Sequence, residues 1–296
     1  NGNTNSVVLT KLNADGQPDA SFGENGSTYA ALTERLQFYD YFSQWPRKLM
    51  SIVKDTADNI FLIAQSFDYY NDRAIVSVFK FNPNGKLDLT FGYKGKTNIQ
   101  TNLSSDYCSP VGIGLQSNGK LVIAIGISPK GSNSDSYIQL VRLNQNGVQD
   151  NSFGVNGKLI QTGLEGFPDS RNSGERNHPG RLVIQPDDKI FLTGTANGTF
   201  TQTIRFSLIR YNSDGTSDKQ FNNGQLLVTQ VVPNSVTYSN SITLQKDNKI
   251  VVAGVNLNNG FCVLRFDSLG RRDLGFGKNG IKTDIAYATD LSRVVI

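Results

Sequence analysis

DASFGENG, residues 19–26, returns along the chain with little change, and this repetition decides the fold. The other copies are DLTFGYKG from Asp88, DNSFGVNG from Asp150, DKQFNNG from Asp218 and DLGFGKNG from Asp273. The phenylalanines of successive copies lie 55 to 69 residues apart. Recurrence at a nearly fixed period indicates a repeat protein in which each copy is one supersecondary unit.

Three further apolar runs belong to each repeat. Two of them flank a polar turn, as in VGIGLQSNGKLVIA (111–124) and RLVIQPDDKIFLTG (181–194). A third run such as IQLVRLN (138–144) precedes the repeated phrase, and a short run such as GKLIQT (157–162) follows it. β-branched runs separated by Asn-Gly and similar turns favour antiparallel strands. Four such strands in about 60 residues are typical of a β-propeller blade.

We therefore predict an all-β fold, a five-bladed β-propeller of four-stranded antiparallel blades that forms one domain over residues 1–296. Residues 1–29 and the final LSRVVI (291–296) would share a composite blade, which would close the ring and leave no open sheet edge. The second strand of that blade is not found in the sequence. The alternatives are six blades or part of a longer repeat array. The complete blades are expected at approximately 48–100, 111–162, 181–230 and 241–286.

The repeated phrase contains a phenylalanine that we interpret as an apolar plug between neighbouring blades. These residues are Phe22, Phe91, Phe153, Phe221 and Phe276. The glycine after each one would permit a backbone conformation that a Cβ opposes. In the fourth copy Asn222 replaces this glycine and one residue is missing, so we expect a distorted turn there.

The aspartate that opens each phrase lies eight residues after a basic residue. The pairs are Lys11 with Asp19, Lys80 with Asp88, Arg142 with Asp150, Arg210 with Asp218, and Arg265 with Asp273. Opposite charges at a constant spacing predict a structural ion pair or a turn-capping network. The stretch Asn212–Asp218 weakly resembles a calcium loop, but most copies offer too few carboxylates. We expect no metal and no cofactor.

Composition excludes several classes of protein. The 29 Lys and Arg barely exceed the 25 Asp and Glu, and they are spread along the chain, so a nucleic-acid partner is not expected. The sequence contains no run of 18 apolar residues, so it does not predict a membrane-spanning helix. Two distant cysteines, Cys108 and Cys262, do not suggest a disulfide framework or a cysteine metal site. We expect a monomeric domain.

The candidate binding residues lie in the connections whose length varies between repeats, since long variable loops on a rigid scaffold are where binding usually occurs. Two of these segments are aromatic and belong to one blade. They contribute Tyr39, Tyr41 and Trp45, and Tyr69, Tyr70, Asp72 and Arg73. Exposed Tyr and Trp beside Arg and Asp are typical of recognition surfaces. The alternative is that the rings fold inward and cap the central channel.

A third variable segment, GLEGFPDSRNSGERNHPG (163–180), carries Arg171, Arg176 and His178. His178 is the single histidine and cannot supply a multi-histidine metal site. No nucleophile-elbow sequence supports a serine hydrolase here. The basic residues favour an acidic ligand, and the ordinary alternative is a solvated surface loop.

The phrases LNQNGVQDNSFGVNGK (143–158) and IQPDDKIFLTG (184–194) resemble the delta-60 repeat, and the resemblance covers nearly the whole chain. Delta-60 repeats occur in tandem in bacterial proteins that are often exported or located at the cell surface. The resemblance implies a propeller-like β architecture and a periplasmic, secreted or surface location. It implies no catalytic residues.

Three functions are compatible with these residues. The first is a non-enzymatic binding or scaffold module that recognises a carbohydrate or a protein through the variable loops. The second is a polysaccharide-acting lyase or hydrolase with its site over the channel, for which Asp40, Asp72 and Glu165 are candidates without a spacing that selects them. The third is a purely structural repeat domain of a larger surface protein.

Overall fold

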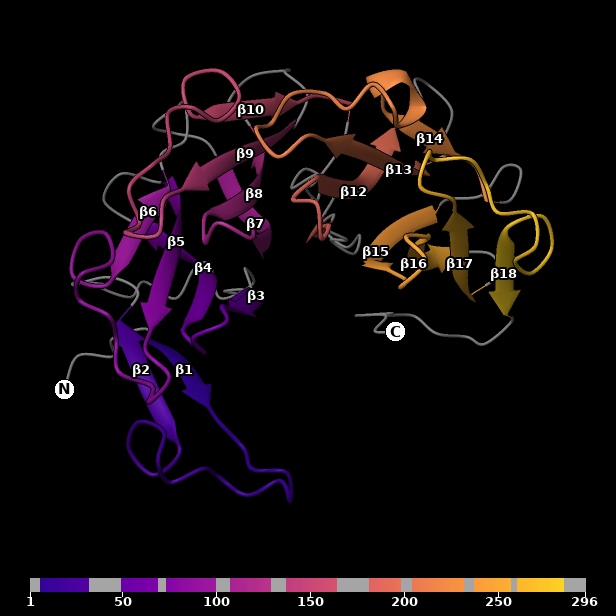
Figure 1. Cartoon of the computed structure of the whole chain (residues 1–296). Coiled ribbons are helices and arrows are strands. Elements are labelled where there is room, and N and C mark those ends of the chain that lie inside the picture. The colour runs from indigo at the N-terminus through magenta and orange to yellow at the C-terminus, as the bar shows by residue number, and fades with distance from the viewer. Residues whose placement is uncertain are drawn as a thin grey trace.

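The computed structural model describes residues 6–31, 49–68, 73–99, 107–128, 137–163, 181–197, 204–231, 237–256 and 260–284. These residues form five antiparallel sheets that follow one another around an arc, and the first and last sheets lie on either side of its opening (Figure 1). Sheet 1 has two strands, and sheets 2 to 5 have four each. The all-β class and the four-stranded unit are therefore confirmed.

Within each sheet the strands are adjacent in the order of the sequence. Sheet 1 consists of β1 (Ser6–Thr10) and β2 (Ser27–Ala31). Sheet 2 consists of β3 (Leu49–Lys54), β4 (Ile60–Asp68), β5 (Arg73–Phe81) and β6 (Lys96–Ile99). Sheet 3 consists of β7 (Tyr107–Leu115), β8 (Leu121–Ser128), β9 (Tyr137–Leu143) and β10 (Lys158–Gln161). Sheet 4 consists of β11 (Arg181–Ile184), β12 (Ile190–Asn197), β13 (Ile204–Tyr211) and β14 (Leu227–Thr229). Sheet 5 consists of β15 (Thr237–Leu244), β16 (Ile250–Asn256), β17 (Gly260–Phe266) and β18 (Ile281–Asp284).

The hydrophobic core is divided into four clusters, and each cluster lies between two adjacent sheets. One strand serves two clusters because successive side chains point to opposite faces of a sheet. In β9, Ile138 and Leu140 pack toward sheet 4, whereas Val141 and Leu143 pack toward sheet 2. Each inner sheet therefore depends on both neighbours for its burial.

A phenylalanine of one sheet packs on a glycine in a turn of the next sheet, and we call this contact the Phe–Gly joint. The side chains of Phe22, Phe91, Phe153 and Phe221 are at most 1% exposed. The glycines on which they pack are, in the same order, Gly85, Gly147, Gly215 and Gly270. A Cβ on any of these glycines would stand within 3.1 Å of the ring. Only glycine leaves room for the plug.

A backbone hydrogen bond accompanies each joint. The residue after the phenylalanine donates its N–H to the carbonyl just before the glycine: Gly23 to Asn84, Gly92 to Asn146 and Gly154 to Asp214, each at 2.8 Å. In the fourth copy Asn222 donates to Leu269 at 3.3 Å. The bond ties neighbouring sheets together at their turns.

The fourth copy is distorted in the way that its sequence predicts. Residues Asn222–Gly224 form a short 3₁₀ turn, η2, with φ of 45° at Asn222 and 57° at Asn223. Asparagine tolerates this left-handed region better than other residues with a side chain. In the described ranges no helix is long and apolar enough to cross a membrane.

The five basic residues and five aspartates of the repeats form ion pairs. The nitrogen–oxygen distances are 2.8 Å for Lys11–Asp19, 2.9 Å for Lys80–Asp88, 2.8 Å for Arg142–Asp150, 2.7 Å for Arg210–Asp218 and 2.8 Å for Arg265–Asp273. In sheets 3, 4 and 5 a second lysine from the preceding turn reaches the same carboxylate. The aspartate thus holds two turns of its own sheet together.

The arginine of the pair also reaches the neighbouring sheet. Arg142 donates from Nη1 to the carbonyl of Ser213 at 2.7 Å, and its guanidinium lies over the Phe153 ring at 4.9 Å from the centroid. Arg210 repeats the first contact with the carbonyl of Ser268 at 2.7 Å. The ion pair therefore positions the same arginine that covers the phenylalanine plug.

The surroundings of Asp150 shift its pKa in opposite directions. Burial acts to raise the pKa of this carboxyl, but hydrogen bonds from Lys120 and Ser152 and the charge of Arg142 outweigh burial. The pKa of Asp150 therefore lies well below its ordinary value of 3.8. A carboxyl whose pKa is lower in the folded state stabilises the fold above its unfolded pKa, and that contribution is lost as pH falls toward the folded value.

The composite blade stays a prediction. Sheet 1 contains the two strands expected from residues 1–29, and LSRVVI (291–296) lies outside the described residues. The arc is open between sheets 1 and 5 (Figure 1). The predicted blade limits are likewise untested.

Replacing Phe153 with Ala should lower the stability of the protein by about 3–5 kcal/mol, because it leaves a cavity at a buried joint. The measurement is the shift of the urea unfolding midpoint. Val155→Ala, two residues away at a side chain that is 77% exposed, is the matched control and should change stability by less than about 0.5 kcal/mol. Equal losses of stability for the two substitutions would contradict the interpretation of Phe153 as an apolar plug between sheets.

Asp150→Asn should destabilise the protein by about 3 kcal/mol at pH 7, because it leaves Arg142 buried without its countercharge. The difference from the unsubstituted protein should shrink as pH falls below about 4, where the aspartate of the unfolded chain becomes protonated. The urea unfolding midpoints of both proteins at pH 7, 5 and 3 measure this difference in stability.

Asp58→Asn, at the exposed Lys54–Asp58 pair, is the control and should have little effect at any pH, because exposed pairs are weak. A loss for Asp150→Asn that is as large at pH 3 as at pH 7 would show that the ion pair is not its cause.

Candidate functional site

One end of every four-stranded sheet carries a turn of constant form, and we call this end the turn face. The turns span residues 55–59, 116–120, 185–189 and 245–249, and in each the first residue donates its N–H to the last carbonyl at 2.8–3.0 Å. The fourth residue has positive φ: 61° at Asp58, 76° at Gly119, 64° at Asp188 and 62° at Asn248. Because this geometry is the same in four sheets, the turn face is a structural feature of the repeat.

The opposite end of the sheets, the loop face, receives all the connections that vary in length. Strand register shows this: Asp68 at the end of β4 pairs with Arg73 at the start of β5, and Ser6 at the start of β1 pairs with Ala31 at the end of β2. The chain segments between these ends, residues 32–48 and 69–72, therefore both emerge at the loop face. They contain most of the predicted aromatic site.

Sheet 2 brings the ends of these two segments together. Residues 32–48 enter β3 at Leu49, and residues 69–72 enter β5 at Arg73, with β4 between the two strands. Neighbouring strands lie about 4.8 Å apart, and Leu49 and Arg73 pair with residues four positions apart along β4, Ala64 and Asp68, so the two entry points are about 16 Å apart. One extended ligand can span that separation.

Most candidate residues lie outside the described residues, and they stay predictions. These are Tyr39, Tyr41, Trp45, Tyr69, Tyr70, Asp72, Arg171, Arg176 and His178. The backbone of Arg73 is described as the first residue of β5. The segment with Arg171, Arg176 and His178 connects β10 to β11, and it also leaves and enters at the loop face.

The first strands of sheets 2 to 5 surround a cavity of about 460 Å³. Most of the residues that line it are apolar, among them Ile52, Val53, Leu115, Val183 and Ile242, although polar atoms contribute more of its exposed surface than apolar atoms do. Lys54 is the one titratable side chain among the described lining residues, and it pairs with Asp58 at the turn face. The hydrogen bond that Lys54 donates to the Asp58 carboxylate raises the pKa of Lys54 above its ordinary value of 10.5, so this lysine stays charged.

Glycine allows two of the first strands to approach closely at this cavity. A Cβ at Gly112 of β7 would lie 3.1 Å from the Cβ of Leu182 in β11, and one at Gly114 would lie 2.5 Å from Ile184. The sequence predicts a central channel but does not identify the residues that line it. The signal that could have found them is the first apolar run of each repeat, whose residues are apolar even where they are exposed, as Ile52 is.

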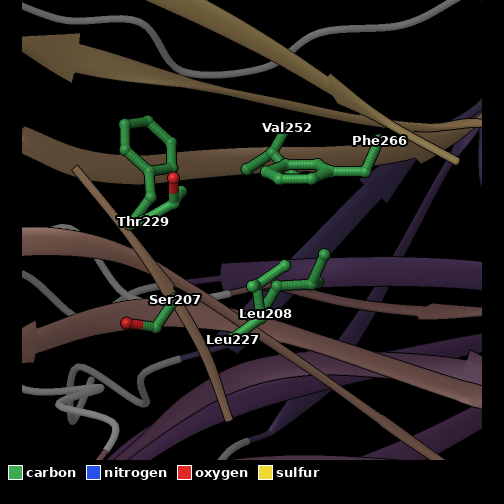
Figure 2. A pocket seen from close by; sticks show the side chains of 7 residues that line it. Ser207, Leu208, Leu227, Thr229, Val252 and Phe266 are labelled. Carbon is green, nitrogen blue, oxygen red and sulfur yellow. The ribbon is translucent and has the colours of Figure 1, made fainter. Parts of the chain in front are cut away.

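A second, much smaller cavity of about 10 Å³ lies between sheets 4 and 5. Figure 2 shows Ser207, Leu208, Leu227 and Thr229 from sheet 4 opposite Val252 and Phe266 from sheet 5. It has room for about one water molecule. It is a packing void in the core of a joint and offers no ligand site.

The described part of the chain contains no cluster of three or more His, Cys, Asp or Glu side chains placed to hold a metal ion. Of the two acidic residues in the calcium-like stretch, Asp214 accepts from Thr216. The oxygens of Asp218 accept from Arg210, Lys189 and the Gln220 N–H. This carboxylate serves the ion-pair network of its sheet.

Two stretches of the chain match a known family. Residues 116–153 and 185–221 fit the model described as domain of unknown function (DUF5122) beta-propeller. Each stretch runs from the turn between the first two strands to the phenylalanine of the repeated phrase. No curated protein matches the chain.

Several solved structures resemble the fold at low similarity. An endo-arabinase from Bacteroides thetaiotaomicron VPI-5482 is 11% identical, with a TM-score of 0.40 over 89% of this chain and 84% of that chain. An alpha-L-arabinofuranosidase from Lactobacillus brevis is 12% identical, with a TM-score of 0.41 over 80% and 76%. A thermostable family-43 glycoside hydrolase is 11% identical, with a TM-score of 0.39 over 77% and 74%. At these values the likeness carries no argument about ligand or reaction.

The family match and the sheets agree with each other. The matched residues of sheets 3 and 4 include two complete strands and the Phe–Gly joint residue of each sheet. Two of the repeats therefore match a β-propeller-like repeat family, and four four-stranded sheets have the form of its blades.

Proposed function

We propose that this chain is a non-enzymatic binding module that recognises a carbohydrate or a protein with its loop face. The observation that carries the proposal is the strand register of sheets 1 and 2, by which the two aromatic-rich segments leave and enter the sheets at the same end. The turn face offers no such variation, because its turns share one geometry.

The chemistry of the two segments suits recognition. Tyr39, Tyr41, Trp45, Tyr69 and Tyr70 provide flat apolar surfaces with a polar edge. Such rings stack on the apolar face of a sugar or fill the centre of a protein interface. Asp72 and Arg73 would add directional hydrogen bonds beside the rings.

A second group on the loop face would extend the site toward acidic ligands. Arg171, Arg176 and His178 belong to the segment between sheets 3 and 4. Two guanidinium groups bind carboxylates in a bidentate manner. In this proposal Arg171, Arg176 and His178 select acidic ligands, whereas the aromatic segments next to sheet 2 supply most of the binding affinity.

The wider proposal is a monomeric, closed ring of five delta-60 repeats in an exported bacterial protein. Residues 1–29 and 291–296 would share its composite blade. The support is the repeat pattern in the sequence and the arc of five sheets in Figure 1. Polysaccharide cleavage would need an acid–base pair over the channel. The described channel walls contribute Lys54 as their titratable side chain, so no described residue favours that alternative.

Trp45→Ala and Tyr70→Ala should each weaken ligand binding at least about tenfold, because aromatic residues at the centre of a binding surface carry most of its energy. An array of neutral and acidic polysaccharides, together with an array of peptides, identifies a ligand for the unsubstituted protein. Titration calorimetry with that ligand then measures the three affinities.

Tyr93→Ala is the matched control, since Tyr93 is a 68% exposed aromatic residue of the same sheet in its repeated phrase, away from the loop face. Its binding should equal that of the unsubstituted protein, and all variants should keep the same circular dichroism spectrum. Two outcomes count against the proposal: no ligand on either array, or a ligand whose affinity falls only in Tyr93→Ala.

A further inference from the structure

Among the described residues, the phenylalanine of sheet 5 has no glycine turn of a next sheet to pack on, unlike the other four phenylalanines. Phe276 is partly exposed, whereas Phe22, Phe91, Phe153 and Phe221 are at most 1% exposed. Within the described residues the N–H of Gly277 donates to no carbonyl, although the equivalent N–H in sheets 1 to 4 bonds to the next sheet. Sheet 5 thus presents half of a Phe–Gly joint.

Sheet 1 presents the matching half. Gly16 has a φ of 79°, like Gly85, Gly147, Gly215 and Gly270, but nothing lies within 4 Å of the position of its Cβ. The turn around it is already formed: Asn13 donates to the carbonyl of Gln17 at 2.8 Å, and Gly16 donates to Asn13 at 3.0 Å. The Asn13–Gly16 turn therefore has the form of the turns that receive a phenylalanine in sheets 2 to 5, but no described residue packs on its glycine.

The strand faces beside these two halves are unpartnered as well. On sheet 1, Val8 is 50% exposed and Leu12 is 56% exposed. The residues equivalent to Leu12 in the other sheets are at most 3% exposed, and they are Phe81, Leu143, Tyr211 and Phe266. This is the face with which each later sheet packs on the sheet before it.

On sheet 5 the opposite face is open. Phe261 and Val263 are partly exposed, whereas their equivalents in sheet 4, Phe206 and Leu208, are buried against sheet 5. One open face therefore belongs to the start of the arc and the other to its end. They are complementary, because each is the surface that the internal joints bury.

We propose that the Phe276 edge of sheet 5 docks on the Asn13–Gly16 turn of sheet 1 in the same chain and forms a fifth Phe–Gly joint. By analogy with the internal joints, the Gly277 N–H donates to the Asp15 carbonyl. Arg265, whose guanidinium lies 4.6 Å from the centroid of Phe276, donates from Nη1 to the Ala14 carbonyl, as Arg142 does to Ser213.

The same chain is the favoured occupant. The five sheets curve in one direction, so that sheets 1 and 5 flank a single opening (Figure 1). Contacts of this head-to-tail type close a ring when the rotation permits and otherwise continue into an open filament. A partner within the same chain acts at an effective concentration of about millimolar, which exceeds that of a second copy in dilute solution. The joint rests on the closed ring proposed above and names the residues that close it, and it does not depend on what the loop face binds.

Electron–electron distance measurements between spin labels test this joint. The labelled pair is Gln17→Cys with Lys278→Cys, both at exposed positions. The matched internal pair is Glu24→Cys with Lys86→Cys, which occupies the same two repeat positions across the joint between sheets 1 and 2. Native Cys108 and Cys262 are buried, and burial raises the pKa of Cys262 to about 12, so they take up little label.

The two pairs should give the same mean distance in the full chain. Diluting the labelled protein with unlabelled protein should leave the Gln17–Lys278 distance unchanged. A longer distance for this pair than for the internal pair would overturn the proposal. A short distance that appears only on mixing singly labelled chains would also overturn it, because the occupant would then be a second copy.

Phe276→Ala should reduce the short-distance population about tenfold or more, because it removes most of the apolar contact at the joint. Leu274→Ala, at a residue that is 70% exposed, is the control and should leave the population unchanged. Leu12→Lys is a second test at a residue that contributes to no internal joint, and it should reduce the population as well. A short distance that persists in both Phe276→Ala and Leu12→Lys would show that other residues hold the ring closed, such as the predicted composite blade.

Discussion

The contact between a phenylalanine and a glycine of the next sheet is the constraint on which the rest of the structure depends. Four such contacts bury rings that are at most 1% exposed, and none of the four glycines has space for a Cβ. The same arginine that covers the ring binds the aspartate of the repeat and a carbonyl of the next sheet, as Arg142 shows. The curvature of the arc follows, because each of the four joints has the same Phe–Gly contact and backbone hydrogen bond, to which Arg142 and Arg210 add a bond to a carbonyl of the next sheet.

This arrangement separates structure from recognition within each repeat. The aspartate, the basic residue and the glycine all act at the turns, so the turn face is determined by the joint. The connections at the opposite end differ in length from repeat to repeat, while the described four-stranded sheets keep the same strand order. Their length and composition can therefore differ between repeats without loss of the fold, which is where a binding site is most readily built.

Much of the fold could be predicted from the sequence, because its determinants are local and repeated. The spacing of Arg142 and Asp150, the turn at Gly119 and the substitution of Asn222 each indicated a conformation that the structure shows. The sequence could not predict which sheet faces pack on each other. The residue types of Leu12 and Phe276 do not distinguish them from their buried equivalents in other repeats. Their exposure depends on whether a neighbouring sheet packs on them. The aromatic site is limited in the same way: residue types such as Trp45 suggest recognition, but residue type alone does not say which side chains come together.

The joint between sheets 4 and 5 differs from the others. Its backbone hydrogen bond is longer, at 3.3 Å against 2.8 Å, and a void of about 10 Å³ lies in its core (Figure 2). In an array held by nearest-neighbour contacts, partial unfolding begins at the weakest contact. The joint between sheets 4 and 5 is therefore the internal joint at which we expect local opening of the scaffold first, ahead of the joints on either side of sheet 3.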